Sequence, residues 1–198
     1  MLLLEGVLPD SASSSQARPL HYAAFGGHIA AVELLLEFHA NVNAVDNTNQ
    51  TALHMATLKG SIEIVTLLLS KGADPSIVAA KTLWTPLHLA AQQGFHVLVG
   101  MLAGAKTGNV NFQDSEHRSA LHWVCFRGDM SSTLMLLEHG ADPMLVDGNN
   151  HSAVEVALAK QYKEISELLL ARIGSYELIR SLHLEIMLSH QAAIPVSY

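Results

Sequence analysis

Histidine binds metal ions and transfers protons near neutral pH, and this chain of 198 residues contains twelve histidines. Four of them, His21, His54, His88 and His122, recur at intervals of 33, 34 and 34 residues. Such a repeat spaces successive rings by about 10 Å, the usual separation of packed helices. The ligands of one zinc ion lie about 2.0 Å from it, so we expect no metal site in this row.

The single cysteine, Cys125, follows His122 by three residues and lies near His117 in the sequence. Two or three such ligands, without a second Cys or His pair, make a poor zinc site. One cysteine also excludes an intramolecular disulfide and fits a reducing compartment.

Other catalytic motifs do not occur. Residues 100–107 superficially resemble a phosphate-binding loop, but Ala105 stands where that motif needs glycine before the lysine, and no strand is expected to precede it. The chain has no HExxH, GxSxG or DxDxDG segment. We therefore expect no catalytic residues, no cofactor and no enzymatic activity.

Composition narrows the possible partners and locations. The 11 Lys and Arg residues against 18 Asp and Glu residues give a formal charge of −7, and no basic cluster suggests a nucleic-acid interface. Apolar runs reach only about four residues, far short of the ~20 that span a bilayer. The first residues lack the basic segment of a signal peptide. We expect a cytoplasmic, or alternatively nuclear, protein that binds neither nucleic acid nor membrane.

A repeat accounts for the spacing of the histidines. Each ends a related tetrapeptide, and a weaker fifth copy follows at residues 152–155: RPLH, TALH, TPLH, SALH and SAVE. Glycine follows each of the first four histidines by six residues, at Gly27, Gly60, Gly94 and Gly128. An aliphatic run comes next in every copy. The sequence therefore predicts one structural unit repeated about every 33 residues.

Elementary physical chemistry makes each unit a pair of short helices. Thr51, Thr85, Ser119 and Ser152 are favourable helix N-caps, and glycine permits the sharp reversal after the first helix. The second helix carries apolar residues at helical spacing, as in Ile62, Val65, Leu68 and Leu69. Helices this short are marginal alone, so neighbouring pairs must stack to bury their apolar faces.

These residues resemble the ankyrin-repeat family, whose signature is T-P-L-H-x-A within about 33 residues. The resemblance implies an all-α ankyrin-repeat solenoid of stacked helix-turn-helix units with short hairpin loops. It also implies that the histidine rings hydrogen-bond to backbone and to Thr or Ser hydroxyls of adjacent units. Cys125 takes the place of a small alanine, which favours a buried, inert thiol.

The repeat divides the chain into segments. We expect a partial, truncated N-terminal repeat at 1–17, four ankyrin repeats at 18–50, 51–84, 85–118 and 119–151, a degenerate fifth repeat or cap at 152–174, a C-terminal capping helix at 175–190 and a frayed tail at 191–198. The partial first repeat has two open explanations, truncation of a longer array or a natural half-repeat cap. The hairpin before Thr85 is one residue longer than the others and should bulge.

The resemblance implies a protein–protein interaction scaffold that holds a partner protein or peptide in a concave groove. The alternative is a regulatory or substrate-recruiting module of a larger enzyme or channel. Ile186 stands where ankyrin ubiquitin-ligase adaptors need a cysteine, which disfavours that subfamily. We expect a monomer whose partner contacts the loop tips and first-helix ends: Phe25, Val45, Asn47, Gln50, Leu58, Lys59, Lys81, Trp84, Gln92, Gln93, Glu116, Arg118, Phe126 and Arg127.

Trp84, Phe126 and Arg127 are of types enriched at interface hot spots, so we expect them to anchor the partner. The alternative is that Trp84 folds over its own bulged loop and that Phe126 packs between units.

Overall fold

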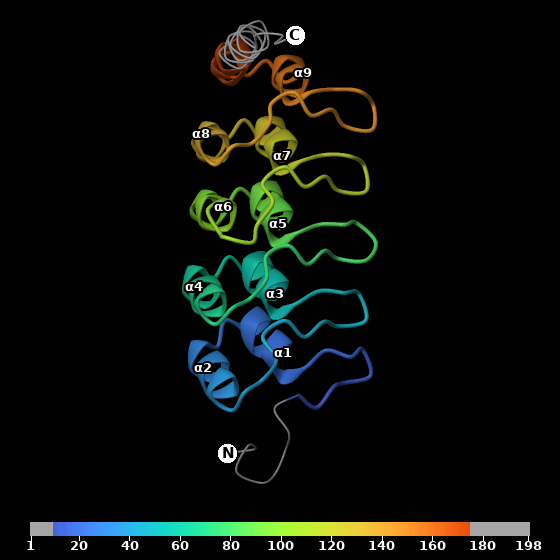
Figure 1. Cartoon of the computed structure of the whole chain (residues 1–198), viewed down its shortest axis with the longest axis vertical. Helices are drawn as coiled ribbons and strands as arrows, with labels where there is room; N and C mark the ends of the chain where they lie inside the picture. Colours follow the sequence, from blue (N-terminus) through green and yellow to red (C-terminus); the bar gives the residue numbers. More distant parts are fainter. Residues whose placement is uncertain (1–9, 175–198) are drawn as a thin grey trace, which may run out of the picture.

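The computed structural model describes residues 10–174, in which pairs of short helices stack into a column (Figure 1). The helices are α1 (Pro19–Gly26), α2 (Ile29–Glu37), α3 (Ala52–Lys59), α4 (Ile62–Ser70), α5 (Pro86–Gln93), α6 (His96–Ala103), α7 (Ala120–Arg127), α8 (Met130–Glu138) and α9 (Ala153–Ala159), and residues 163–174 are also helical. Within 10–174 there are two isolated β-bridges and no strand. The predicted all-α solenoid is confirmed.

Each inner helix begins at a polar cap. Thr51, Thr85 and Ser152 accept the backbone N–H three residues on, which satisfies a donor that has no partner within the helix. Pro86 occupies the first turn of α5, where its missing N–H costs nothing. The predicted starts at these caps are therefore confirmed.

The inner helices end at left-handed glycines. Gly27, Gly60, Gly94 and Gly128 have φ angles of 74°, 76°, 79° and 73°, a conformation that strains residues with a Cβ atom. In the fifth unit Gln161 takes this place with φ 63°. The chain then reverses into the outer helix.

One hydrophobic core runs the length of the stack. The inner helices contribute Leu20, Leu53 and Leu121, and the outer helices contribute Val32 and Val65, all at most 1% exposed. Burying a side chain of this kind stabilises the folded state by about 1.5–3 kcal/mol. The opposite side of each inner helix lies beside the hairpin loops, as Figure 1 shows for α1, α3, α5 and α7.

The loops are closed by the same backbone hydrogen bond, except for the loop before Thr85. Asp46, Asp114 and Asp147 each begin a loop in which the aspartate N–H donates to the carbonyl four residues on. In the loop before Thr85 the corresponding bond runs from Ala79 N–H to the Trp84 carbonyl, five residues on. The predicted extra residue therefore does lengthen this loop, which also lacks the aspartate.

Consecutive loops are joined by single backbone hydrogen bonds. Asn47 N–H donates to the Ser15 carbonyl at 2.9 Å, and Ala80, Ser115 and Gly148 make the corresponding bond to the loop before theirs. Each loop is thereby held in register with its neighbour.

Parts of the predicted segment scheme fall outside the described residues. The capping helix at 175–190 and the tail at 191–198 lie outside them, as do residues 1–9 of the partial repeat. Residues 13–17 form a loop of the same kind as the others, closed by Ser13 N–H to the Ala17 carbonyl at 2.9 Å. The segment limits themselves stay predictions.

Candidate functional site

Each repeated histidine joins the start of an inner helix to the loop that leads into the next inner helix. His54 Nδ1 accepts the backbone N–H of Thr51 at 3.2 Å and lies 2.9 Å from the Thr51 hydroxyl. His54 Nε2 lies 3.2 Å from the Trp84 carbonyl in the next loop, and because Nδ1 accepts, Nε2 carries the proton and donates. Both partners therefore lie within 51–84, the ring's own predicted repeat, and not in an adjacent repeat as we expected; Trp84 directly precedes Thr85, the cap of the next inner helix.

Burial favours the neutral form of the His54, His88 and His122 rings. It lowers the pKa of His54 to about 4 and lowers the pKa of His88 and His122, although the acceptor carbonyls oppose the shift. Both nitrogens of each ring are already hydrogen-bonded. Residues 10–174 contain no group of three or more His, Cys, Asp or Glu side chains arranged to hold a metal ion.

Cys125 is fully buried in α7. Burial raises the pKa of its thiol to about 12, opposed by a hydrogen bond with Thr133. The thiolate is the nucleophilic form of cysteine, so this side chain has no means of acting as a nucleophile in the folded protein.

The surface that remains is the one between the loops and the inner helices, which we call the inner face. Its exposed apolar side chains are Tyr22 and Phe25 of α1, Leu58 of α3 and Phe126 of α7, from 39 to 59% exposed. Tyr22 and Phe25 line one cavity together, and neighbouring exposed apolar side chains are a sign of an interaction surface.

A buried carboxylate organises the middle of the inner face. Asp114 Oδ2 accepts hydrogen bonds from Trp84 Nε1 at 3.1 Å, Arg118 Nε at 3.1 Å and Trp123 Nε1 at 3.3 Å. Its Oδ1 accepts the backbone N–H groups of Glu116 and Arg118, each at 2.9 Å. Burial raises the pKa of Asp114, but the N–H donors and the Arg118 charge outweigh it and hold the pKa below its usual range.

The two tryptophans and Arg118 also contact each other around this carboxylate. The indole rings of Trp84 and Trp123 meet edge to face, with centroids 5.3 Å apart. The Arg118 guanidinium lies 4.3 Å from the centroid of Trp123 and also pairs with Glu116 at 2.9 Å. We call Trp84, Asp114, Arg118 and Trp123 the tryptophan–aspartate cluster.

Phe126 and Arg127 differ in their surroundings. The Phe126 ring is 51% exposed, with the Lys160 ammonium 4.0 Å above its centroid. Arg127 instead donates to the Gln92 carbonyl at 3.0 Å and lies over Gly94 of the preceding unit. Phe126 is therefore the more available of the two for a partner.

The fourteen residues that sequence predicted for partner binding fall into two sets. Nine have exposed side chains: Phe25, Asn47, Leu58, Lys59, Lys81, Gln93, Glu116, Phe126 and Arg127. Five are half-buried: Val45, Gln50, Trp84, Gln92 and Arg118. The structure brings Trp84 together with Arg118 around Asp114, and Arg127 together with Gln92, but places Phe25 and Phe126 three units apart.

Sequence reasoning missed Tyr22, Asp114 and Trp123. Tyr22 and Trp123 each follow a repeated histidine directly, at the position that faces the loops. The aspartates at 46, 114 and 147, each five residues before an N-cap, were the available signal for the loop carboxylates.

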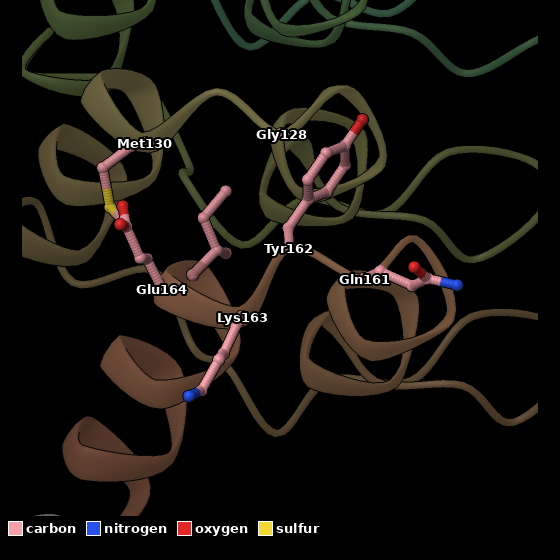
Figure 2. Close-up of a pocket in the computed structure, with 7 residues that line it drawn as sticks. Gly128, Met130, Gln161, Tyr162, Lys163 and Glu164 are labelled. Atoms are coloured by element: carbon pink, nitrogen blue, oxygen red, sulfur yellow. The ribbon is translucent and has the colours of Figure 1, made fainter.

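Hollows beside the interhelix turns belong to the repeat architecture. One of about 330 Å³ is lined by Gly128, Met130, Tyr162 and Glu164, among others, and Figure 2 shows the Tyr162 ring beside the turn at Gly128. A related hollow of about 190 Å³ lies at Gly60 and Phe95. An ideal Cβ on Gly128 would come within 2.6 Å of the Tyr162 ring, so this hollow exists because of how one unit caps the turn of the previous one.

The described helices include none with both the length and the apolar character needed to cross a lipid bilayer.

Several known proteins are similar to this chain in sequence. The chain is 31% identical over 179 residues to the human Ankyrin repeat and SOCS box protein 16, covering 85% of this chain and 39% of that protein. It is 32% identical over 141 residues to zebrafish (Danio rerio) Inversin, covering 71% of this chain and 14% of the relative. The segment around Ile186, which we expect to lack the cysteine-bearing box of ubiquitin-ligase adaptors, lies outside the described residues, so that expectation stays a prediction.

A third relative and a family comparison lead to the same family. The chain is 31% identical over 160 residues to the probable 26S proteasome regulatory subunit p28 of Saccharomyces cerevisiae, covering 79% of this chain and 70% of the relative. The family model described as Ankyrin repeats (3 copies) matches residues 1–79 and 87–179. With the stacked helix pairs, the hairpin loops and the bridging histidines, these matches show that the chain belongs to the ankyrin-repeat family.

Proposed function

We propose that this chain is a protein–protein interaction module without catalytic activity, which holds a partner protein or peptide against its inner face. Ankyrin repeats are generally protein-interaction modules. The observation that carries the proposal is the row of exposed apolar side chains on the inner face, Phe25, Leu58 and Phe126 with Tyr22. Burying them against a partner would remove apolar surface from water at about 25 cal/mol per Å².

The chemistry of the reactive side chains supports the absence of catalysis. The repeated histidines use both ring nitrogens to hold the stack together, and the thiol of Cys125 is buried with a raised pKa. We place the module in the cytoplasm, as a monomer, and propose the fourteen predicted residues as its contact set, with Tyr22 and Trp123 added.

A matched pair of triple variants tests the proposal. One replaces Phe25, Leu58 and Phe126 on the inner face with alanine, and the other replaces Ile29, Leu34 and Leu134 on the outer helices, which are similarly exposed at 40–41%. Affinity capture from extracts of cells that express the protein, followed by quantitative mass spectrometry, compares both with wild type. We expect the inner variant alone to lose captured proteins, with helical circular dichroism unchanged. Equal capture by both variants would refute an inner-face site.

A second candidate function has its own observation. The chain spans 39% of one relative and 14% of another, so the repeats of those relatives are parts of longer proteins. This favours a regulatory or recruiting module of a larger protein as the alternative. Identification of a catalytic or membrane domain encoded in the same transcript would support it.

A further inference from the structure

The inner face contains a cavity of about 240 Å³ beside α1. Tyr22, Phe25, Met55 and Ala17 line it, together with Asp46, Ser15 and His21, whose Nε2 already donates to the Gln50 carbonyl. The two aromatic residues are 59% and 51% exposed, so the cavity opens to solvent. An acid set among aromatic rings is an arrangement that suits a cation.

Within residues 10–174, only one of the two oxygens of the Asp46 carboxylate accepts hydrogen bonds. Oδ1 accepts the backbone N–H groups of Thr48 and Gln50 at 2.8 and 2.9 Å, and the Thr48 hydroxyl at 2.7 Å. Oδ2 accepts no hydrogen bond from any residue in 10–174. The guanidinium of Arg18 pairs with Asp10, at 3.3 Å.

At Asp114, the corresponding aspartate two loops later, the second carboxylate oxygen does have hydrogen-bond donors. There Oδ2 accepts from Arg118 and from the indoles of Trp84 and Trp123. Arg118 and Trp84 directly precede the inner-helix caps Ser119 and Thr85, and Trp123 follows Ser119 by four residues. The corresponding residues around Asp46 are Gln50, Ala17 and Met55, which are smaller or uncharged.

Both loops therefore present a carboxylate in the same way, but among residues 10–174 only Asp114 has side-chain donors on its Oδ2. At Asp114 the filling group is a guanidinium on an indole face, with Arg118 4.3 Å from the Trp123 centroid. At Asp46 the aromatic side chains come from α1, and no guanidinium of the described residues reaches the carboxylate. Residues 1–9, which precede this region, contain no Lys or Arg.

We propose that the cavity at Asp46 binds an arginine side chain of the partner protein, its guanidinium donating to Asp46 Oδ2 and stacking against Tyr22 or Phe25. Arginine suits the site better than lysine because its planar fork donates several hydrogen bonds and stacks on rings at once. The chain's formal charge of −7 favours the approach of a basic segment. This inference rests on the proposed function, because it names a residue of the partner that the inner face would hold.

A random peptide library displayed on phage and selected on the full chain tests the inference. Selected peptides are synthesised with a fluorescein label, and their affinities are measured by fluorescence polarisation. We expect the selected sequences to share an arginine. Replacing that arginine with citrulline, which has the same shape and no charge, should weaken binding about ten- to a hundredfold, the range for a charge-assisted hydrogen bond.

Three variants connect the arginine to the cavity. Asp46→Asn keeps an oxygen for the loop N–H groups but removes the charge, and it should weaken binding about as much as citrulline does. Gln50→Arg should weaken binding too, because it supplies an internal guanidinium at the position that Arg118 has relative to Asp114. Asp147→Asn is the matched control, since Asp147 makes the same loop bonds to Asn149 and His151, and it should leave binding unchanged. On Asp46→Asn the citrulline peptide should bind as well as the arginine peptide.

The outcomes separate this inference from the proposed function. Peptides without a basic residue that bind Asp46→Asn at full strength, yet lose binding when Phe25, Leu58 and Phe126 are replaced, would overturn the arginine site and leave the inner face as an interaction surface. Peptides whose binding depends on neither Asp46 nor the inner-face triple would overturn both. Failure to select any binding peptide would count against both as well.

Discussion

Removing the Asp114 carboxylate should destabilise the protein by about 3 kcal/mol. Asp114→Ala leaves five donors without their acceptor: two backbone N–H groups, two indole N–H groups and the Arg118 guanidinium. A hydrogen bond to a charged group contributes about 1.5–3 kcal/mol, but several of these donors can be rehydrated. Removing one partner of a buried ion pair costs about 3–5 kcal/mol, and the half-buried Arg118 places our value at the lower end.

The protein carries its own probe for this measurement. Its two tryptophans are both members of the tryptophan–aspartate cluster, so fluorescence during urea unfolding reports the cluster, while far-ultraviolet circular dichroism reports all the helices. Asp147→Ala is the control, since Asp147 accepts the same loop N–H groups but no indole or guanidinium, and it should cost about 1 kcal/mol or less. A difference between the two variants below about 0.5 kcal/mol would show that the shared acceptor contributes little.

The effect should also depend on pH in a defined direction. The folded-state pKa of Asp114 lies below its usual value of 3.8, so the folded protein binds this proton less readily than the unfolded chain. The stabilisation is therefore complete above about pH 4 and is lost as the pH falls through the folded-state pKa. Wild type and Asp114→Asn should accordingly converge in stability at the most acidic pH.

Three further predictions follow from the same geometry. Burial lowers the pKa of His54 from 6.5 to about 4, so the folded state resists protonation and the free energy of unfolding should fall by about 3 kcal/mol as the pH drops from 6.5 to 4. Measured by urea unfolding at several pH values, this free energy should depend less on pH in His54→Gln than in wild type. An equal dependence in both proteins would contradict the assignment. Gly128→Ala should cost about 2 kcal/mol or more, because a Cβ would meet the Tyr162 ring at 2.6 Å, whereas Gly140→Ala, also at positive φ but with open space, should cost about 1 kcal/mol; thermal unfolding that ranks them equally would rule out the clash. Cys125 should react with a disulfide reagent only as fast as the protein unfolds, and rapid labelling of the native protein would show that the thiol is accessible.

The sequence predicts the parts of this fold that depend on local chemistry. The caps at Thr51 and Thr85 and the turn glycines act within a few residues of themselves, so their types reveal their conformations. The longer loop before Thr85 also follows from counting residues, although the positive φ of Leu83 within it, 54°, does not. Asparagine is the residue type that tolerates this conformation best after glycine, and Asn49 and Asn150 hold the same place elsewhere.

The candidate site was less predictable because its contacts cross between units. Trp84 was expected either to anchor a partner or to fold over its own loop, but it donates to Asp114 thirty residues away and packs on Trp123. The sequence of a repeat indicates which positions face the loops, but it does not indicate which side chains of two neighbouring units contact each other there. The same reason hid the cavity at Asp46, which exists because Ala17, Gln50 and Met55 are all too small or too neutral to close it.

The bridging histidines give the stack a direction. Each ring donates its Nε2 proton forward to the last residue of the following loop, at Gln50, Trp84, Arg118 and His151, so each inner helix is linked to the residue directly before the cap of the next inner helix. Glu155 takes the histidine position in the fifth unit and turns its carboxylate back to Ser152. The fifth unit therefore follows a carbonyl that accepts such a bond, but it has no imidazole at position 155 to donate the next one. Adding an identical repeat after it would first require histidine at position 155.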